Sequence, residues 1–228
     1  KQYKDKIEFP VISDVKIDGL RCNALESGLF SRNGKPFVSC PHILEALQPA
    51  FAKYPEYVFD AELYNIELKH EFNKIVSLVK KVKPTKDDLL ESAKLIKFYM
   101  FDIFRKDGKE VLTAIERKNL VDKIVLELDN PSIVSVGYEI CNNHQELDAA
   151  YARYLSEGAE GQMINEYNAL YSHARSKALL KRKEFQDAEF LILDIISGKG
   201  AREGAAVLVL QGANNQTFQS SLTGTVEY

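Results

Sequence analysis

The hydrophobic pattern of this chain of 228 residues changes once, at about residue 187. Before that point, apolar residues occur at helical spacing in some segments and in short strand-like runs in others. After it, helical spacing stops, and strand-like runs at 189–196 and 206–210 alternate with turns rich in Gly, Asn and Gln. A mixed segment followed by strands alone predicts an α+β domain, residues 1–186, and a second domain, residues 187–228, that begins a small β-barrel without completing it.

The first domain opens with two strand-like runs, residues 11–16 and 21–27, on either side of Asp18 and Gly19. An Asp-Gly pair between such runs is a strong hairpin signal, so we expect these two strands to pair. An Asn-Gly turn at 33–34 predicts a second hairpin by the same reasoning.

Periodicity and capping residues predict the other elements of this domain. Strands are expected at 56–64 and 95–104, and helices near 41–54, 72–82, 116–128 and 146–156, with another that begins at Thr85. Pro49 is expected to bend or end the first of these helices.

Charge and cysteine content restrict the class of protein. The formal net charge of −3 argues against coating nucleic acid through bulk charge, but it leaves room for a local basic groove. The three cysteines are far apart and form no CxxC pair, which favours reduced thiols and a cytoplasmic protein. No apolar run approaches the roughly 20 residues that a membrane span requires, so no membrane partner is expected.

Lys16 lies between Val15 and Ile17 and next to the predicted turn. A lysine amine attacks an electrophile only when it is deprotonated, so a nucleophilic lysine needs desolvation or neighbouring cations that lower its pKa. Taken alone, the Lys-x-Asp-Gly run favours a surface hairpin with an incidental lysine. By itself it does not identify a nucleophile.

Several acidic residues have the spacing of a metal or ribose site. Asp60 and Glu62 share one face at the end of a predicted strand, where they would bind a hard cation or ribose hydroxyls. A solvated strand end explains this pair equally well. Gly161 would let a ligand approach the backbone closely, so that Glu160 directs a carboxylate at a bound metal.

The segment 172–184 is the most basic part of the chain, with five cationic side chains and one acidic one. Lys181 and Lys183 share one face of a predicted strand, where they would clamp a triphosphate and lower the pKa of a nearby lysine. A basic edge strand that discourages aggregation is the alternative. The aromatic run 98–104 is explained mostly by core packing, but one of its rings is suited to stack on a purine.

The order and spacing of these segments resemble the motif series of the covalent nucleotidyltransferase superfamily, which contains ligases and capping enzymes. The matching segments are Lys16-x-Asp18-Gly19-x-Arg21, Ser31-Arg32-Asn33-Gly34, Asp60-Ala61-Glu62-Leu63, Phe101-Asp102, Glu160-Gly161-x-Met163 and Leu180-Lys181-x-Lys183. Within the superfamily, Arg21 and the segment 31–34 are similar to ATP-dependent DNA ligases, and the compact length is similar to the small ligases of bacteriophages. The resemblance extends from about residue 11 to residue 185.

The resemblance implies a nucleotidyltransferase domain of antiparallel sheets and helices, followed by a partial OB-fold. It implies a monomeric, Mg²⁺-dependent enzyme that seals nicks in double-stranded DNA and uses ATP as the AMP donor. In the implied reaction, Lys16 attacks the α-phosphorus of ATP to form a lysyl-adenylate. The AMP then moves to the 5′-phosphate at a nick, and the neighbouring 3′-hydroxyl displaces it.

The resemblance also assigns roles to single residues. Asp14 is expected to contact the adenine amino group, and Phe101 to stack on the ring. Glu62 is expected to bind the ribose or a metal, and Glu160 a metal. Lys181 and Lys183 are expected to bind the phosphates of ATP. Arg21 and Arg32 are expected to bind the nucleotide and the nick phosphate, and Asp18 to assist the steps at the nick.

Two departures from the family pattern leave alternatives open. The segment after Glu160 has no basic residue near its end, and the late basic motif that orients pyrophosphate is absent from the tail. An RNA ligase or an mRNA-capping guanylyltransferase would use the same lysine chemistry. A non-catalytic nucleic-acid-binding module is a further alternative, although every chemically demanding position is filled. An NAD⁺-dependent ligase is disfavoured, because the residues before Lys16 are too few to hold its additional domain.

Overall fold

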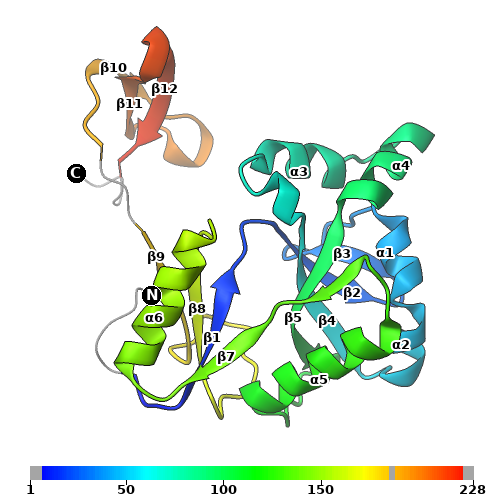
Figure 1. Cartoon of the computed structure of the whole chain (residues 1–228). Helices are drawn as coiled ribbons and strands as arrows, with labels where there is room; N and C mark the ends of the chain where they lie inside the picture. Colours follow the sequence, from blue (N-terminus) through cyan, green and yellow to red (C-terminus); the bar gives the residue numbers. More distant parts are fainter. Residues whose placement is uncertain (1–6, 185–187, 223–228) are drawn as a thin grey trace. The chain divides into compact units, whose positions relative to one another are not determined.

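The computed structural model describes residues 7–184 and 188–222 (Figure 1). These residues form two units, 7–184 and 188–222. The first unit contains two sheets and the helices α1 to α6, and the second contains one three-stranded sheet. The α+β class predicted from the sequence is therefore confirmed.

The first sheet of unit 1 has four antiparallel strands in the order β7-β1-β8-β9. Their bounds are β7 Tyr138–Cys141, β1 Val11–Lys16, β8 Gly161–Glu166 and β9 Leu179–Lys183. Helix α6 (His144–Ser156) packs on one face of this sheet and buries Val11, Cys141, Leu147, Ala150, Tyr154 and Ile164. Val15 belongs to the same packed layer. Because side chains alternate along a strand, Asp14 and Lys16 project from the opposite face.

The second sheet has five strands in the order β3-β2-β4-β5-β6, of which only β5 and β6 are parallel to each other. The strands are β3 Gly28–Ser31, β2 Leu20–Leu25, β4 Tyr57–Tyr64, β5 Lys97–Arg105 and β6 Ile133–Ser135. The helices around this sheet are α1 Pro41–Ala46, α2 Gln48–Lys53, α3 Phe72–Val79, α4 Lys86–Leu95 and α5 Ala114–Leu128 (Figure 1). Together they bury the main hydrophobic core, which includes Phe51, Phe59, Phe98 and Met100.

Local capping chemistry explains where the helices begin. Thr85 and Asp88 form a reciprocal capping box at the start of α4, and Thr113 and Glu116 form another at the start of α5. The predicted helix over 41–54 is divided into α1 and α2, because a proline can start a helix but cannot continue one. These helix predictions are confirmed.

The hairpin predicted around Gly19 is wrong. Strand β1 pairs with β7 and β8, whereas β2 pairs with β3 and β4, so the chain crosses from one sheet to the other after Lys16. Gly19 is required by a close approach and not by a left-handed backbone, since an added Cβ would lie 2.8 Å from the carbonyl oxygen of Leu63. A second crossover, at Val136 and Gly137, joins β6 of one sheet to β7 of the other.

The hairpin that does form joins β2 to β3, and its turn lies at Glu26 and Ser27. The turn predicted at 33–34 is also present. Gly34 has a φ of 73° and donates its N–H to the carbonyl oxygen of Ser31 at 2.9 Å. Only a single bridge, between Phe30 and Pro36, extends this turn, so it reverses the chain without building a long ladder.

The second unit is an antiparallel sheet in the order β10-β11-β12. Its strands are β10 Ile192–Ser197, β11 Ala206–Gln211 and β12 Thr217–Ser221, with 3₁₀ turns at Gly200–Arg202 and Ala213–Asn215. The two strands expected in this region are confirmed, and β12 was not predicted. Residues 185–187, where the sequence places the domain boundary, lie outside the described residues.

Candidate active site

Lys16 is the last residue of β1, and its Nζ forms an ion pair with Oε2 of Glu160. Glu160 directly precedes β8, whose first residue, Gly161, is paired with Lys16 across the ladder. Lys183 lies opposite Gly161 on β9, and its Nζ is 3.3 Å from the other carboxylate oxygen of Glu160. Three neighbouring strands therefore bring two ammonium groups onto one carboxylate.

The charge state of Glu160 follows from these contacts. Burial raises the pKa of the Glu160 carboxyl, but Lys16 and Lys183 outweigh burial and hold that pKa below its ordinary value. The carboxylate is therefore ionised at neutral pH. The Lys16 side chain is 21% exposed, so it is largely withdrawn from water but still open to an incoming ligand.

A cavity of about 1080 Å³ adjoins Lys16. This volume is slightly above the roughly 300–1,000 Å³ that is typical of small-molecule sites. Its walls contain seven of the eight residues predicted to bind the nucleotide: Asp14, Lys16, Arg21, Arg32, Glu62, Phe101 and Lys181. The eighth, Lys183, joins the group through Glu160. Residues from both sheets of unit 1 therefore meet at one cavity.

Arg21 is held by Asp60 in a bidentate contact, with Nε 2.9 Å from Oδ1 and Nη2 2.5 Å from Oδ2. Tyr171 donates its hydroxyl to the same Oδ2 at 2.9 Å, and the hydroxyl oxygen accepts from Arg21 at 3.0 Å. The two carboxylates predicted to act as a pair, Asp60 and Glu62, therefore have different roles. Both residues line the cavity, but Asp60 is fully buried and uses its two carboxylate oxygens to hold Arg21.

One oxygen of the Glu62 carboxyl group has no hydrogen-bond partner within residues 7–184 and 188–222. Burial and then the neighbouring Asp60 raise the pKa of Glu62 to about 8. Its Oε2 is buried and has no hydrogen-bond partner among the described residues. Since buried polar groups are nearly always hydrogen-bonded, this oxygen is suited to a ribose hydroxyl or a cation that enters with the ligand.

The two acidic residues predicted to bind a metal were Glu62 and Glu160. Within residues 7–184 and 188–222 there is no cluster of three or more His, Cys, Asp or Glu side chains that would hold an ion by itself. Magnesium does not require one, since proteins usually hold it through one or two carboxylates together with substrate phosphates and water. The unpartnered oxygen of Glu62 and the ionised carboxylate of Glu160 fit that mode of binding.

Asp14 and Phe101 border the same cavity from different sheets. Asp14 is 8% exposed, and its Oδ2 forms an ion pair with Lys118 of α5, whereas its Oδ1 is buried and has no partner in the described part of the chain. Phe101 is half-buried at an irregularity in the β4–β5 ladder, and the Arg21 guanidinium lies 5.8 Å from its ring centroid. An unpartnered acceptor and an aromatic face are both available to a base.

The other predicted residues lie nearer the surface. Arg32 is exposed in the Asn-Gly turn, and Lys181 is exposed on β9; both line the large cavity. Asp18 is exposed in the first crossover and lines a different cavity.

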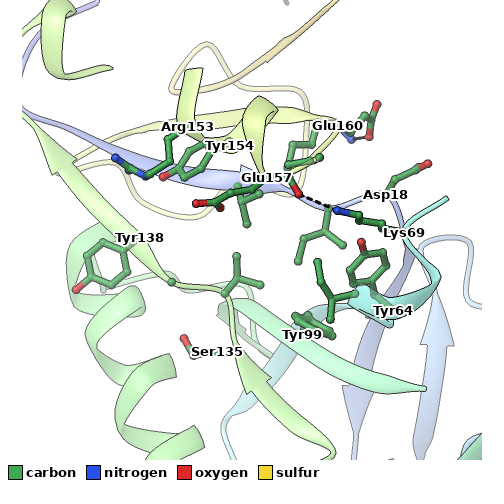
Figure 2. Close-up of a pocket in the computed structure, with 18 of the residues that line it drawn as sticks. Asp18, Tyr64, Lys69, Tyr99, Ser135, Tyr138, Arg153, Tyr154, Glu157 and Glu160 are labelled. Carbon is green, nitrogen blue, oxygen red and sulfur yellow. Dashed lines mark hydrogen bonds and ion pairs between the residues drawn. The ribbon is translucent and has the colours of Figure 1, made fainter. Parts of the chain in front are cut away.

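This second cavity, of about 560 Å³, also borders Lys16 and was not predicted from the sequence (Figure 2). The rings of Tyr64 and Tyr99 lie in its wall with their centroids 5.3 Å apart. Lys69 donates to the main-chain oxygen of Glu157 at 3.1 Å, as Figure 2 shows. Lys16, Asp18 and Glu160 of its lining belong to the matched motifs, but most of the other lining residues, among them Tyr64 and Tyr99, lie outside them. The motif series therefore did not predict this cavity.

The reason for a glycine at position 161 differs from the one predicted. An added Cβ would lie 2.1 Å from the carbonyl oxygen of Arg182 on the adjacent strand. The close approach is therefore between β8 and β9, and not between the backbone and a ligand.

Three residues that organise the site were missed by the sequence analysis. Arg117 and Lys118 are 2% and 3% exposed, although charged residues are rarely buried without a partner. Tyr171 is the third. In the sequence, the two cations look like an exposed helical turn and the tyrosine like part of a loop, because their partners are distant in the chain.

A sequence model of the family described as "ATP dependent DNA ligase domain" matches residues 1–183. Among curated proteins, the chain is similar to the DNA ligase of African swine fever virus (isolate Tick/South Africa/Pretoriuskop Pr4/1996), with 26% identity over 215 residues. That match covers 89% of this chain and 49% of the viral protein. The chain is 25% identical to the DNA ligase of Enterobacteria phage T4, with 86% of this chain and 48% of the phage protein covered. It thus spans about half the length of these relatives.

Two solved structures of DNA ligases are similar to the three-dimensional structure of this chain. The first, from a study entitled "DNA binding with a minimal scaffold: Structure-function analysis of Lig E DNA ligases", has a TM-score of 0.74 and 22% identity, and the match covers 95% of this chain and 79% of the other. The second, the Chlorella virus DNA ligase-adenylate, has a TM-score of 0.62 and 20% identity, with 97% and 82% covered. These similarities confirm the predicted fold class. No helix among the described residues is long and apolar enough to cross a membrane.

Proposed function

The chain belongs to the family of ATP-dependent DNA ligases, and from this premise we propose that it forms a lysyl-adenylate on Lys16 and transfers the AMP to a nick in duplex DNA. The observation that carries the proposal is the cluster of Lys16, Glu160 and Lys183 at the edge of a cavity of nucleotide size. A lysine in an exposed hairpin, the alternative raised by the sequence, would have neither of these surroundings.

In the first step, the Lys16 ammonium gives one proton to water or to Glu160, and the resulting neutral amine attacks the α-phosphorus of ATP. The amine loses a second proton to water as the phosphoramidate forms. A phosphorus–nitrogen bond forms, the bond to the β-phosphate oxygen breaks, and pyrophosphate leaves. Transfers of this kind depend on positioning and on neutralising charge at the non-bridging oxygens. Lys181 and Lys183 project from the same face of β9, and Lys183 already lies beside the nucleophile through Glu160. We assign these two lysines to the phosphates.

Glu62 and Glu160 would hold Mg²⁺, with triphosphate oxygens and water completing its coordination. The ion would supply positive charge that neutralises the phosphates during transfer. Asp14 and Phe101 would hold the adenine, and Glu62 the ribose when it does not contact the metal. Arg21, fixed by Asp60 and Tyr171, presents its guanidinium at a defined place in the cavity.

In the later steps the AMP passes to the 5′-phosphate of the nick, and the 3′-hydroxyl attacks that phosphate and releases AMP. Arg32 is exposed at the cavity wall, where a guanidinium is well placed to bind a phosphate in a bidentate manner. Asp18 is exposed in the crossover next to the nucleophile and would act at the nick. Because the formal net charge of the protein is −3, we expect DNA to be bound by a local basic groove and not by the whole surface. The affinity for DNA should fall as the salt concentration rises.

Three broader expectations belong to the same proposal. We take residues 187–228 as the start of an OB-type domain, in keeping with the strand-only content of the second unit. We expect a monomer that acts in the cytoplasm, where Cys22, Cys40 and Cys141, all buried and free, would stay reduced.

The test is to incubate the full chain with α-labelled ATP and Mg²⁺ and to follow label on the protein. Wild type should become labelled, Lys16→Ala should not, and Lys94→Ala should match wild type, because Lys94 is an exposed residue of α4. Adding nicked duplex should then release the label and seal the strand. Labelling of the Lys16→Ala protein would overturn the assignment of Lys16 as the nucleophile. Labelling by GTP, or sealing of nicked RNA alone, would favour a capping enzyme or an RNA ligase.

A further inference from the structure

We propose that Lys118 is a positioning residue that makes the base site selective for a purine with a 6-amino group, by holding Asp14 and Phe101 in a fixed arrangement. The inference rests on the proposed function, since it concerns the base of the nucleotide that Lys16 attacks. Nothing in the motif series points to Lys118, which lies on α5 and outside every matched segment.

Lys118 connects the two sheets at the base site. Its side chain is 3% exposed, and its Nζ forms an ion pair with Asp14 on β1 of the first sheet. The same Nζ donates to the main-chain oxygen of Phe101 at 2.8 Å, on β5 of the second sheet. One ammonium group therefore sets the distance between the acceptor carboxylate and the strand that carries the stacking ring.

Helix α5 provides a rigid base for this ammonium group. The neighbouring Arg117 contacts Asp102 with two hydrogen bonds, at 2.6 and 3.3 Å, and donates at 2.9 Å to the main-chain oxygens of Leu112 and Ala169. Asp102 follows Phe101 directly on β5. These hydrogen bonds hold the helix against the strand beside the stacking ring, and Lys118 reaches Asp14 from this helix.

The unpartnered oxygen of Asp14 indicates a ligand. Lys118 occupies Oδ2, while Oδ1 is buried beside the cavity without a partner among the described residues. An ion pair that served only the fold would be expected to satisfy both oxygens, because a buried acceptor without a donor is unfavourable. A 6-amino group donates hydrogen bonds and matches this oxygen, whereas the 6-oxo group of guanine is itself an acceptor.

The ammonium group also controls what Asp14 offers to the base. Burial raises the pKa of Asp14 above its ordinary value, and Lys118 offsets only part of that rise. In its ion pair with Lys118, the ionised carboxylate is an acceptor only. If the ammonium is removed, the buried carboxyl tends to take up a proton, and its O–H can then donate to a 6-oxo group. Loss of Lys118 should therefore reduce discrimination between the two kinds of purine, beyond any general loss of affinity.

The experiment compares ATP, GTP and purine riboside triphosphate, which lacks the 6-amino group, as substrates of the full chain. The measurement is covalent attachment of the nucleoside monophosphate to the protein. Wild type should prefer ATP over purine riboside triphosphate by about 10- to 100-fold in kcat/KM, the value of one hydrogen bond to a charged group. In Lys118→Met this ratio should fall to within about threefold. Lys118→Arg should restore part of it. Lys123→Met, an exposed lysine on the same helix, should keep the wild-type ratio.

Removing one member of a buried ion pair can prevent folding, so Asp14→Asn/Lys118→Met serves as a second variant without either charge. It should fold, as judged by circular dichroism and thermal melting, and should still lack the ATP preference. A folded Lys118→Met protein, or a folded double variant, with the wild-type ratio would overturn the inference.

The proposed function and this inference fail in different ways. If wild type forms no covalent adduct with any nucleotide, the proposed chemistry fails. Calorimetric binding of the three nucleotides to wild type and Lys118→Met would then still decide whether Lys118 sets base preference. If wild type is labelled and its preference does not depend on Lys118, only the inference fails.

Discussion

Lys16 and Glu160 form an ion pair that joins the end of β1 to the residue before β8, and Lys183 approaches the same carboxylate from β9. The two lysines occupy both oxygens of Glu160. A proposed nucleophile is thus held, before any nucleotide binds, by an acid that we also assign to the metal.

Replacing Glu160 with Gln should slow formation of the lysyl-adenylate by about 10²-fold, on the scale of losing one preorganised electrostatic contact. The amide keeps the shape of the side chain but loses the charge that orients Lys16 and would hold Mg²⁺. Single-turnover labelling with α-labelled ATP measures this rate. Glu157→Gln, an exposed neighbour, is the control and should react as wild type does. Equal rates for both variants would remove Glu160 from the mechanism.

Replacing Glu62 with Gln should make stability less dependent on pH. The folded-state pKa of Glu62 is about 8, above the ordinary value of 4.5, so the folded protein holds a proton that the unfolded chain releases. This contribution is complete below about pH 4.5 and is lost as pH rises through 8. Urea unfolding without nucleotide should show that Glu62→Gln gains roughly 3–4 kcal/mol relative to wild type between pH 5 and pH 9. Glu67→Gln, with an exposed side chain, should follow wild type.

Replacing Tyr171 with Phe should loosen Arg21. The change removes the hydroxyl that donates to buried Asp60 at 2.9 Å and accepts from Arg21 at 3.0 Å. We expect a stability loss of about 1–2 kcal/mol, together with weaker use of ATP measured as a higher KM for labelling. Tyr167→Phe, earlier in the same loop, tests whether any tyrosine change there has this effect. A Tyr171→Phe enzyme with wild-type stability and KM would show that the hydroxyl is dispensable.

Replacing Gly19 with Ala should disturb the first crossover, because the added Cβ would lie 2.8 Å from the carbonyl oxygen of Leu63. We expect destabilisation of about 1–3 kcal/mol, and slower labelling since Lys16 lies three residues earlier. Gly137→Ala in the second crossover is a matched control, because, apart from its chain neighbours, no atom of the described residues lies within 4 Å of the added Cβ. Thermal melting measures the stability of both variants. Equal melting temperatures for Gly19→Ala and Gly137→Ala would contradict the predicted destabilisation by the clash at Gly19.

Much of the fold was predictable from local signals. The capping boxes at Thr85 and Thr113 are complete within four residues of sequence, so the helices they start could be found directly. The strand period placed Lys181 and Lys183 on one face of β9 in the same way. The choice of partner strand was not predictable, because the pairing of β1 with β7 and β8 depends on residues more than a hundred positions away.

By itself, the sequence determined which chemical groups are present, their order along the chain and the elements that carry them, since capping, periodicity and motif spacing are properties of neighbouring residues. Only the tertiary structure decided how those groups are used. It showed that Asp60 holds Arg21 and that one oxygen of Glu62 has no partner among the described residues. It also showed that Lys118 on α5 contacts Asp14 of one sheet and Phe101 of the other. The physical reason is that a buried charge takes its role from the partner that packing brings to it, and that partner is distant in the chain.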